Sequence, residues 1–163
     1  MNEDDYTTTI TSSLSRREVY DAASDPRRWW SETITGVTDA VGGVFEYEVP
    51  GVHFSRIEVT ELVPGVRVVW RVLEATLSFV ADRHEWEGTE IRFDIDEHAG
   101  ASELRFTHVG LVPSAECYTA CFDGWSFYIG TSLRRLLETG SGEPNRLPAE
   151  VRLLEEQASA AGA

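Results

Sequence analysis

The chain has 163 residues and a mass of 18.2 kDa, which is long enough for one domain with a substantial hydrophobic core. It carries 14 basic and 28 acidic residues, a formal net charge of −14, so we expect no binding to nucleic acid or to an anionic membrane surface. All basic residues are arginines, and the absence of lysine from the sequence excludes a P-loop lysine and every Schiff-base mechanism.

The N-terminus and the cysteines bear on localisation. The first nine residues, MNEDDYTTT, are acidic and polar, unlike a signal peptide, and no apolar run approaches the roughly 20 residues that cross a bilayer. Only two cysteines occur, Cys117 and Cys121. We therefore expect a cytoplasmic protein with reduced thiols.

The first elements along the chain are predicted to be a strand and two short helices. Residues 6–14 are rich in threonine, which is typical of a strand. Ser15 and Glu18 fit a capping box, so a helix should follow through Ala23. Pro26 favours the start of a second short helix.

Residues 36–109 change to a pattern of period two. In the run 90–96, for example, Ile91, Phe93 and Ile95 alternate with charged residues. Such alternation is typical of antiparallel strands with one face in solvent and one face covered. Glycine and proline pairs separate about six such strands, and we expect one more strand within residues 74–88.

A long helix is expected after these strands, with Ser114 as its N-cap and Gly140 as its C-cap. About 25 residues would make a rod of about 38 Å. Its apolar stripe should pack on the covered face of the sheet; the stripe comprises Tyr118, Phe122, Trp125, Ile129, Leu133 and Leu136. Residues 145–163 are predicted to form a short terminal helix, over 148–157, and a frayed tail.

This order of elements predicts a helix-grip fold of the α+β class. It would consist of a curved antiparallel sheet of about six to seven strands, wrapped around a long C-terminal helix, with two short helices after the first strand. We expect one domain over residues 1–163, because no repeat or central linker is visible.

The cysteine pair raises two chemical hypotheses. Helical spacing stacks Cys117 and Cys121 one turn apart, but a structural zinc needs four ligands and the four histidines are scattered, so we predict no metal site. A nucleophilic cysteine would need a base such as His108, which strand parity places on the covered face. His108 could equally be a satisfied core histidine. We assign no catalytic residue and no cofactor.

An aromatic lining between sheet and helix is the remaining signal. Small-molecule sites are typically concave apolar pockets with few polar groups. Gly124, which has no side chain, would let a ligand approach the helix closely. A filled core is the alternative. The candidate ligand-binding residues are Phe45, Tyr47, Trp70, Phe93, Phe106, His108, Tyr118, Cys121, Phe122 and Trp125.

Three segments carry a family resemblance: HEWEGTEIRFDI (84–95), ELRFTHVGLVPSAECY (103–118) and DGWSFYIGTSLRRLLETGSGEP (123–144). They resemble the START-like SRPBCC superfamily, and within it bacterial proteins named after the activator of the Hsp90 ATPase. The resemblance implies a helix-grip (Bet v 1-like) fold with a cavity under the C-terminal helix. It supplies no shared catalytic motif.

Three functional hypotheses follow. The first is binding of a small apolar or aromatic molecule in the cavity. The second is a protein-interaction module that acts on a chaperone-type ATPase, as the family name suggests. Its partner would be another protein, or a second copy of the chain in a homodimer. The third is a cyclase or hydrolase that uses His108 for acid–base chemistry, although no sequence motif requires catalysis.

Overall fold

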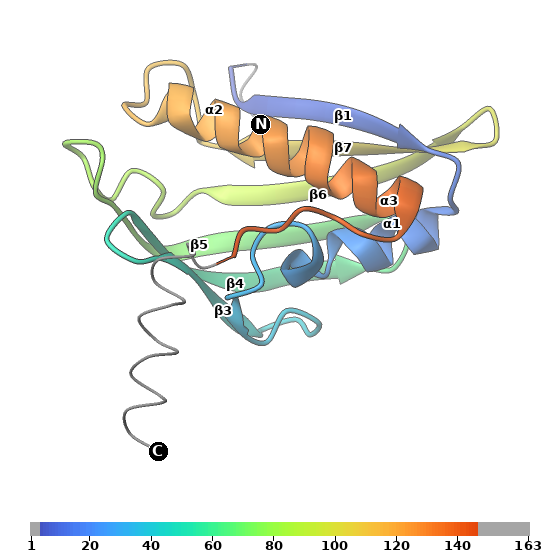
Figure 1. Ribbon diagram of the computed structural model, residues 1–163, viewed down its shortest axis with the longest axis horizontal. Coiled ribbons are helices and arrows are strands. Elements are labelled where there is room, and N and C mark those ends of the chain that lie inside the picture. Colours follow the sequence, from blue (N-terminus) through green and yellow to red (C-terminus); the bar gives the residue numbers. More distant parts are fainter. Residues whose placement is uncertain (1–3, 147–163) are drawn as a thin grey trace.

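A seven-stranded antiparallel sheet forms one layer of the structure (Figure 1). The computed structural model describes residues 4–146; the terminal helix and tail predicted beyond residue 147 lie outside this range. The strands lie in the order β1-β7-β6-β5-β4-β3-β2. Their bounds are β1 Tyr6–Ser12, β2 Thr35–Gly36, β3 Val44–Val49, β4 His53–Val63, β5 Arg67–Leu77, β6 Glu90–His98 and β7 Ala101–Val109.

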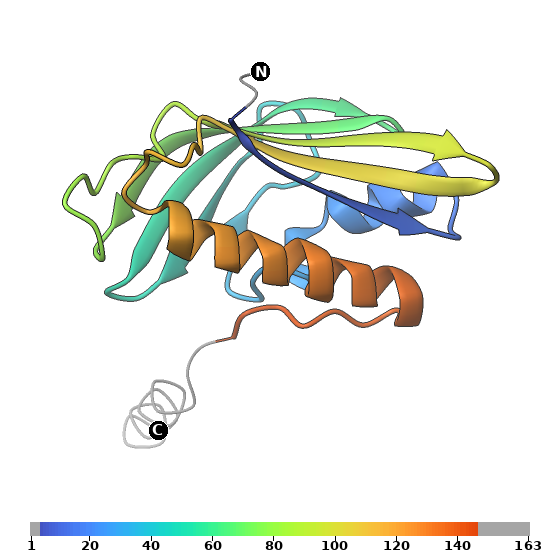
Figure 2. The same ribbon diagram turned by 90° about the horizontal axis from the view of Figure 1, so that it is seen from above.

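A long C-terminal helix lies along one face of this curved sheet (Figure 2). It runs without interruption through α2 (Tyr118–Phe127), η2 (Tyr128–Leu133) and α3 (Arg134–Thr139). Gly140 ends it in the left-handed conformation, with a φ of 84°, as predicted. The helix-grip fold of the α+β class is thus confirmed. No helix within residues 4–146 is both long and apolar enough to cross a membrane.

The elements after β1 follow their sequence signals. Helix α1 (Arg16–Ala23) begins with the predicted capping box, in which the Glu18 amide donates to the Ser15 hydroxyl at 3.1 Å. Pro26 starts a single 3₁₀ turn, η1 (Pro26–Arg28). The chain then places Trp29 and Trp30 inside the core.

Two local predictions are wrong, and one loop explains both. Residues 78–89 form turns rather than an extra strand, because the chain folds back at the end of β5, where the Leu77 amide donates to the Arg83 carbonyl at 2.8 Å. Ser114 does not cap the long helix. Its place is taken by Glu85 of the same loop, whose carboxylate accepts from the Glu116 and Cys117 amides at 2.7 and 2.9 Å.

The π-helical segment η2 changes which side of the long helix is buried. Here the Arg134 amide donates to the carbonyl of Ile129, five residues earlier, so each turn takes more residues than in an α-helix. A four-residue spacing relates the buried Cys117, Cys121, Trp125, Ile129, Leu133 and Leu137, and Ser132 and Leu136 are buried beside the last of them. The predicted stripe is correct from Trp125 onward and wrong at its start.

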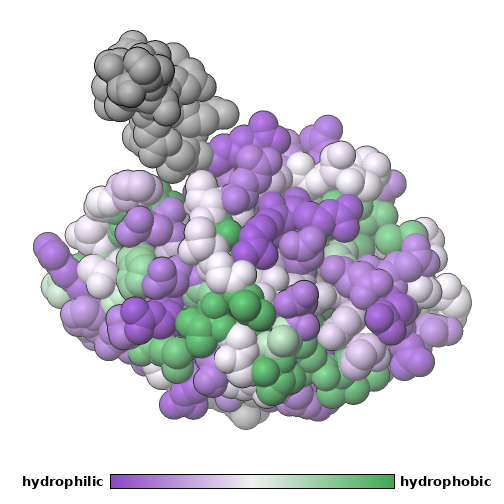
Figure 3. All heavy atoms as spheres, turned by 90° about the horizontal axis from the view of Figure 1, so that it is seen from below, coloured by the Kyte–Doolittle hydropathy of each residue, from purple (hydrophilic) through white to green (hydrophobic). Residues whose placement is uncertain are grey.

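Charged side chains occupy the solvent face of the sheet. Arg67 on β5 forms an ion pair with Asp94 on β6 at 2.8 Å, and Arg56 on β4 pairs with Glu74 at 2.8 Å. On the face of the molecule seen in Figure 3, hydrophobic side chains lie in small groups between hydrophilic ones. The hydrophobic residues of the strands point mainly to the helix side, where the core and the pocket lie.

Candidate ligand-binding pocket

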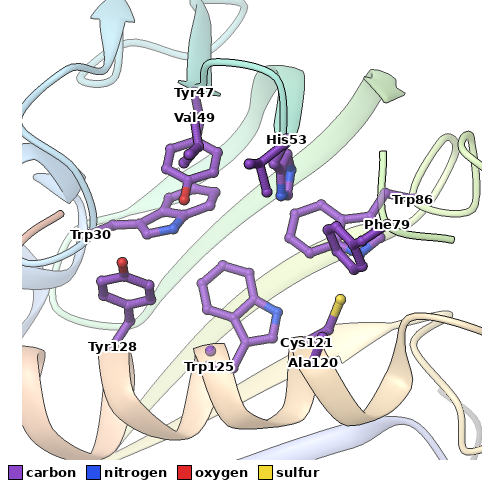
Figure 4. A pocket seen from close by; sticks show the side chains of 12 residues that line it. Trp30, Tyr47, Val49, His53, Phe79, Trp86, Ala120, Cys121, Trp125 and Tyr128 are labelled. Atoms are coloured by element: carbon purple, nitrogen blue, oxygen red, sulfur yellow. The ribbon is translucent and has the colours of Figure 1, made fainter. Parts of the chain in front are cut away.

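A pocket of about 160 Å³ opens between the first half of the long helix and one end of the sheet (Figure 4). The helix, the β3–β4 hairpin, the loop 78–89 and the chain after η1 all contribute to it. Its lining comprises Trp30, Tyr47, Val49, Val52, His53, Phe79, Trp86, Ala120, Cys121, Gly124, Trp125 and Tyr128.

Aromatic rings in mutual contact form the wall of the pocket. Trp30 stacks on Tyr47 with ring centroids 4.3 Å apart and meets Trp125 at 5.0 Å. Trp125 in turn stacks on Trp86 at 5.8 Å, with only 12° between the ring planes. His53 joins Tyr47 and Trp86 through edge-on contacts at 4.9 and 4.6 Å. Because each ring is held by its neighbours, the wall is preformed.

A buried hydrogen-bond chain behind this wall fixes Trp125. Its indole Nε1–H donates to Nδ1 of His108 at 3.0 Å, so the proton of the neutral imidazole must sit on Nε2, which lies 2.9 Å from the Thr89 hydroxyl. Thr89 then donates to the carbonyl of Trp86 at 2.6 Å. Burial, with a smaller effect of His53, lowers the pKa of His108 to about 3. His108 is therefore a satisfied core histidine, with neither ring nitrogen free to act as a base.

No arginine, aspartate or glutamate side chain within residues 4–146 lines the pocket. Burial lowers the pKa of His53 to about 4, and its Nε2 lies 2.6 Å from the Ser55 hydroxyl. Burial also raises the pKa of the Tyr47 and Tyr128 phenols. Both hydroxyls point towards Trp30 (Figure 4), and a hydrogen bond with the Asn145 side chain partly offsets the effect of burial on each pKa.

The two cysteines are free thiols buried beside the pocket. The Cys121 sulfur points from the helix towards Trp86 (Figure 4), whereas Cys117 lies one turn earlier. A hydrogen bond from Cys117 lowers the pKa of the Cys121 thiol, and the same pairing raises that of Cys117. Within residues 4–146 no cluster of three or more histidine, cysteine or acidic side chains could hold a metal ion.

The predicted site residues fall into three groups. Tyr47, Cys121 and Trp125 line the pocket. A second set is fully buried in the core around or behind it, namely Phe45, Trp70, Phe93, Phe106 and His108. Tyr118 is half-buried outside the pocket, and the interior position expected for Phe122 is wrong. Phe122 is 44% exposed and packs edge-on against Tyr6 at 5.3 Å, because the buried side of the helix runs through the cysteines.

Several lining residues were missed by the sequence reasoning. Val49 and His53 could have been found, because they share strand parity with the buried Tyr47 and Ile57. Trp30, Phe79 and Trp86 lie in turns and loops, where no periodicity gives the direction of a side chain. Gly124 opens onto the pocket as expected, since a Cβ there would meet no atom within 4 Å.

Comparison with known proteins agrees with this architecture. A family model described as Activator of Hsp90 ATPase homolog 1-like protein matches residues 13–138, well over half of the chain. No curated protein matches the chain.

Solved structures show the same fold. The solution structure of the Aha1 dimer from Colwellia psychrerythraea is 25% identical with a TM-score of 0.68, and the match covers 85% of this chain and 98% of that one. DynU16, a putative protein in the dynemicin biosynthetic locus, is 21% identical with a TM-score of 0.61, over 86% of this chain and 49% of its own length. CalU16 from Micromonospora echinospora is 17% identical with a TM-score of 0.60, over 96% and 84%.

Proposed function

The chain belongs to the Activator of Hsp90 ATPase homolog 1-like family, and we propose that it binds one small apolar or aromatic molecule in the pocket between its sheet and its long helix. The observation that carries this proposal is the preformed aromatic pocket itself. Proteins rarely keep an open apolar space in a core without a use for it, because interiors pack closely and each unfilled volume costs stability.

The size of the pocket limits the ligand. An engineered apolar cavity of about 150 Å³ is known to hold benzene, so a pocket of about 160 Å³ accommodates a molecule of about one ring. Pockets that hold larger, drug-sized ligands have volumes of about 300–1,000 Å³. The expected ligand is therefore a single-ring aromatic or an aliphatic group of similar size.

A titration of intrinsic fluorescence tests the proposal. Trp30, Trp86 and Trp125 all line the pocket, so an aromatic ligand should quench their emission in a saturable way. A panel of single-ring compounds is titrated into the protein, and each hit is checked for a raised melting temperature, since a ligand that binds only the folded state stabilises it.

Two helix glycines provide a matched pair of variants. A Cβ at Gly124 or at Gly130 would meet no atom within 4 Å, but only Gly124 lines the pocket. Gly124→Leu should weaken binding at least tenfold by filling the space, whereas Gly130→Leu should bind like the wild type. Binding that survives Gly124→Leu, or no binding across the whole panel, would contradict the proposal.

Protein interaction is a second candidate function, favoured by one observation. The 25% identical protein from Colwellia psychrerythraea is described as an Aha1 dimer. A homodimer of the present chain would appear as a concentration-dependent mass in light scattering after size exclusion. A constant monomer mass up to high concentration would argue against self-association.

A further inference from the structure

The faces of aromatic rings dominate the pocket. Not counting His53, six of the twelve lining residues are aromatic: Trp30, Tyr47, Phe79, Trp86, Trp125 and Tyr128. Tyr47, Trp86 and Trp125 turn their ring faces to the viewer who looks into the pocket (Figure 4). The face of an aromatic ring is the negative end of its quadrupole, and tryptophan has the strongest effect.

The lining holds no arginine that would repel a cation. None of the arginines within residues 4–146 lines the pocket. His53 is the only basic group in the lining, and it is neutral at pH 7 because burial lowers its pKa to about 4. Arg83 lines a neighbouring surface hollow together with Glu48.

The charge around the pocket also favours a cation. The protein carries a formal net charge of −14. The loop 78–89, which supplies Phe79 and Trp86, holds Asp82, Glu85 and Glu87 against the single Arg83. A cation approaching the mouth is thus attracted by the protein as a whole, while an anion is repelled.

We propose that the natural ligand is an organic cation of the methylated ammonium class, held by its charge against these ring faces. The inference rests on the proposed function, since it names the chemistry of the ligand of the same pocket. A trimethylammonium group is compact and apolar on its surface, so it suits the volume of about 160 Å³. It has no N–H group and is less strongly hydrated than a primary ammonium, and proteins recognise such groups by the faces of aromatic rings.

A pair of isosteric probes tests the charge alone. Choline and 3,3-dimethylbutan-1-ol differ only in the central atom, a positively charged nitrogen in the first and a neutral carbon in the second. Isothermal titration calorimetry should show that choline binds at least tenfold more tightly than 3,3-dimethylbutan-1-ol. The preference should persist in 0.5 M NaCl, because salt screens exposed charges but reaches a buried contact much less.

Two half-exposed phenylalanines give a matched control. Phe79 is 45% exposed and lines the pocket, whereas Phe127 is 43% exposed and lies outside it. Phe79→Leu keeps an apolar side chain but removes the ring, so choline affinity should fall at least threefold while that of the neutral probe stays unchanged. Phe127→Leu should alter neither.

The outcomes separate this inference from the proposed function. Equal or tighter binding of the neutral probe overturns the cation, while the pocket remains a ligand site. A preference for choline that vanishes in 0.5 M NaCl, or that is unaffected by Phe79→Leu, also overturns it, because the attraction then comes from the surface charge. If neither probe binds, the cation is overturned, and the proposed function is then decided by the single-ring panel alone.

Discussion

Acidification should destabilise the fold through His108, the buried residue that holds Trp125 in place. Nδ1 of His108 accepts a hydrogen bond from the Trp125 indole N–H at 3.0 Å. Protonation of His108 would turn this acceptor into a donor, and two N–H groups would then face each other. Burial lowers the pKa of His108 from 6.5 to about 3. Between these values the unfolded chain binds a proton that the folded protein does not, so this contribution to stability is complete above pH 6.5 and is lost as the pH falls towards 3.

The magnitude at pH 5 follows from the ordinary pKa of histidine. At that pH the imidazole is neutral in the folded state and protonated in the unfolded state, 1.5 pH units below 6.5. Each unit corresponds to about 1.4 kcal/mol, so His108 alone should remove about 2 kcal/mol from the free energy of unfolding between pH 7 and pH 5.

Urea unfolding of three proteins at both pH values isolates this effect. His108→Gln keeps a donor and an acceptor but does not titrate, so it should lose about 2 kcal/mol less than the wild type on acidification. His98→Gln, at an exposed position at the end of β6, is the matched control and should behave like the wild type. An equal loss in His108→Gln and the wild type would refute the reasoning, whatever the cost of the substitution at pH 7.

Two further predictions concern long-range hydrogen bonds. Glu85→Ala removes the acceptor of two amides at the start of the long helix, at 2.7 and 2.9 Å, and should cost about 1–2 kcal/mol in urea unfolding. A cost no larger than that of the exposed Glu97→Ala would show that the cap is dispensable. Ser132→Ala removes a buried hydroxyl that donates to the Trp29 carbonyl and accepts from the Glu143 amide, both at 2.7 Å, and should cost about 1–3 kcal/mol. Hydrogen exchange at the Glu143 amide should accelerate, and unchanged protection would contradict the assigned role.

The fold was predictable because its signals are local. The period-two alternation of residues 36–109 identifies which side of each strand is covered, and that side faces the helix in the structure. The capping box at Ser15 and the stop at Gly140 act within a few residues, and both are present. Such features depend only on residues that are close in the sequence, so the sequence alone reveals them.

The pocket was only partly predictable because it is assembled from distant segments. Strand parity and helix spacing point to Tyr47 and Trp125, but Trp30 enters from the irregular stretch before β2 and Trp86 from the loop between β5 and β6. Ser114 was the natural local N-cap, yet a carboxylate some thirty residues earlier took that role. Contacts of this kind are decided by tertiary packing, which overrides local preference.

The wide turn η2 also determines where the long helix tolerates a change in its length. In terms of the gene, η2 corresponds to one inserted codon, because a π-helical turn holds one additional residue between the two flanking α-helical segments. Losing one residue of this segment would therefore let the wide turn close into a regular α-helical turn with both flanks in place. Cys121 and Trp125, which lie before the segment, would keep their places in the wall. A single-codon deletion within Tyr128–Leu133 should thus be inherited more readily than one in α2 or α3, where a lost residue turns one half of the helix by about 100° relative to the other.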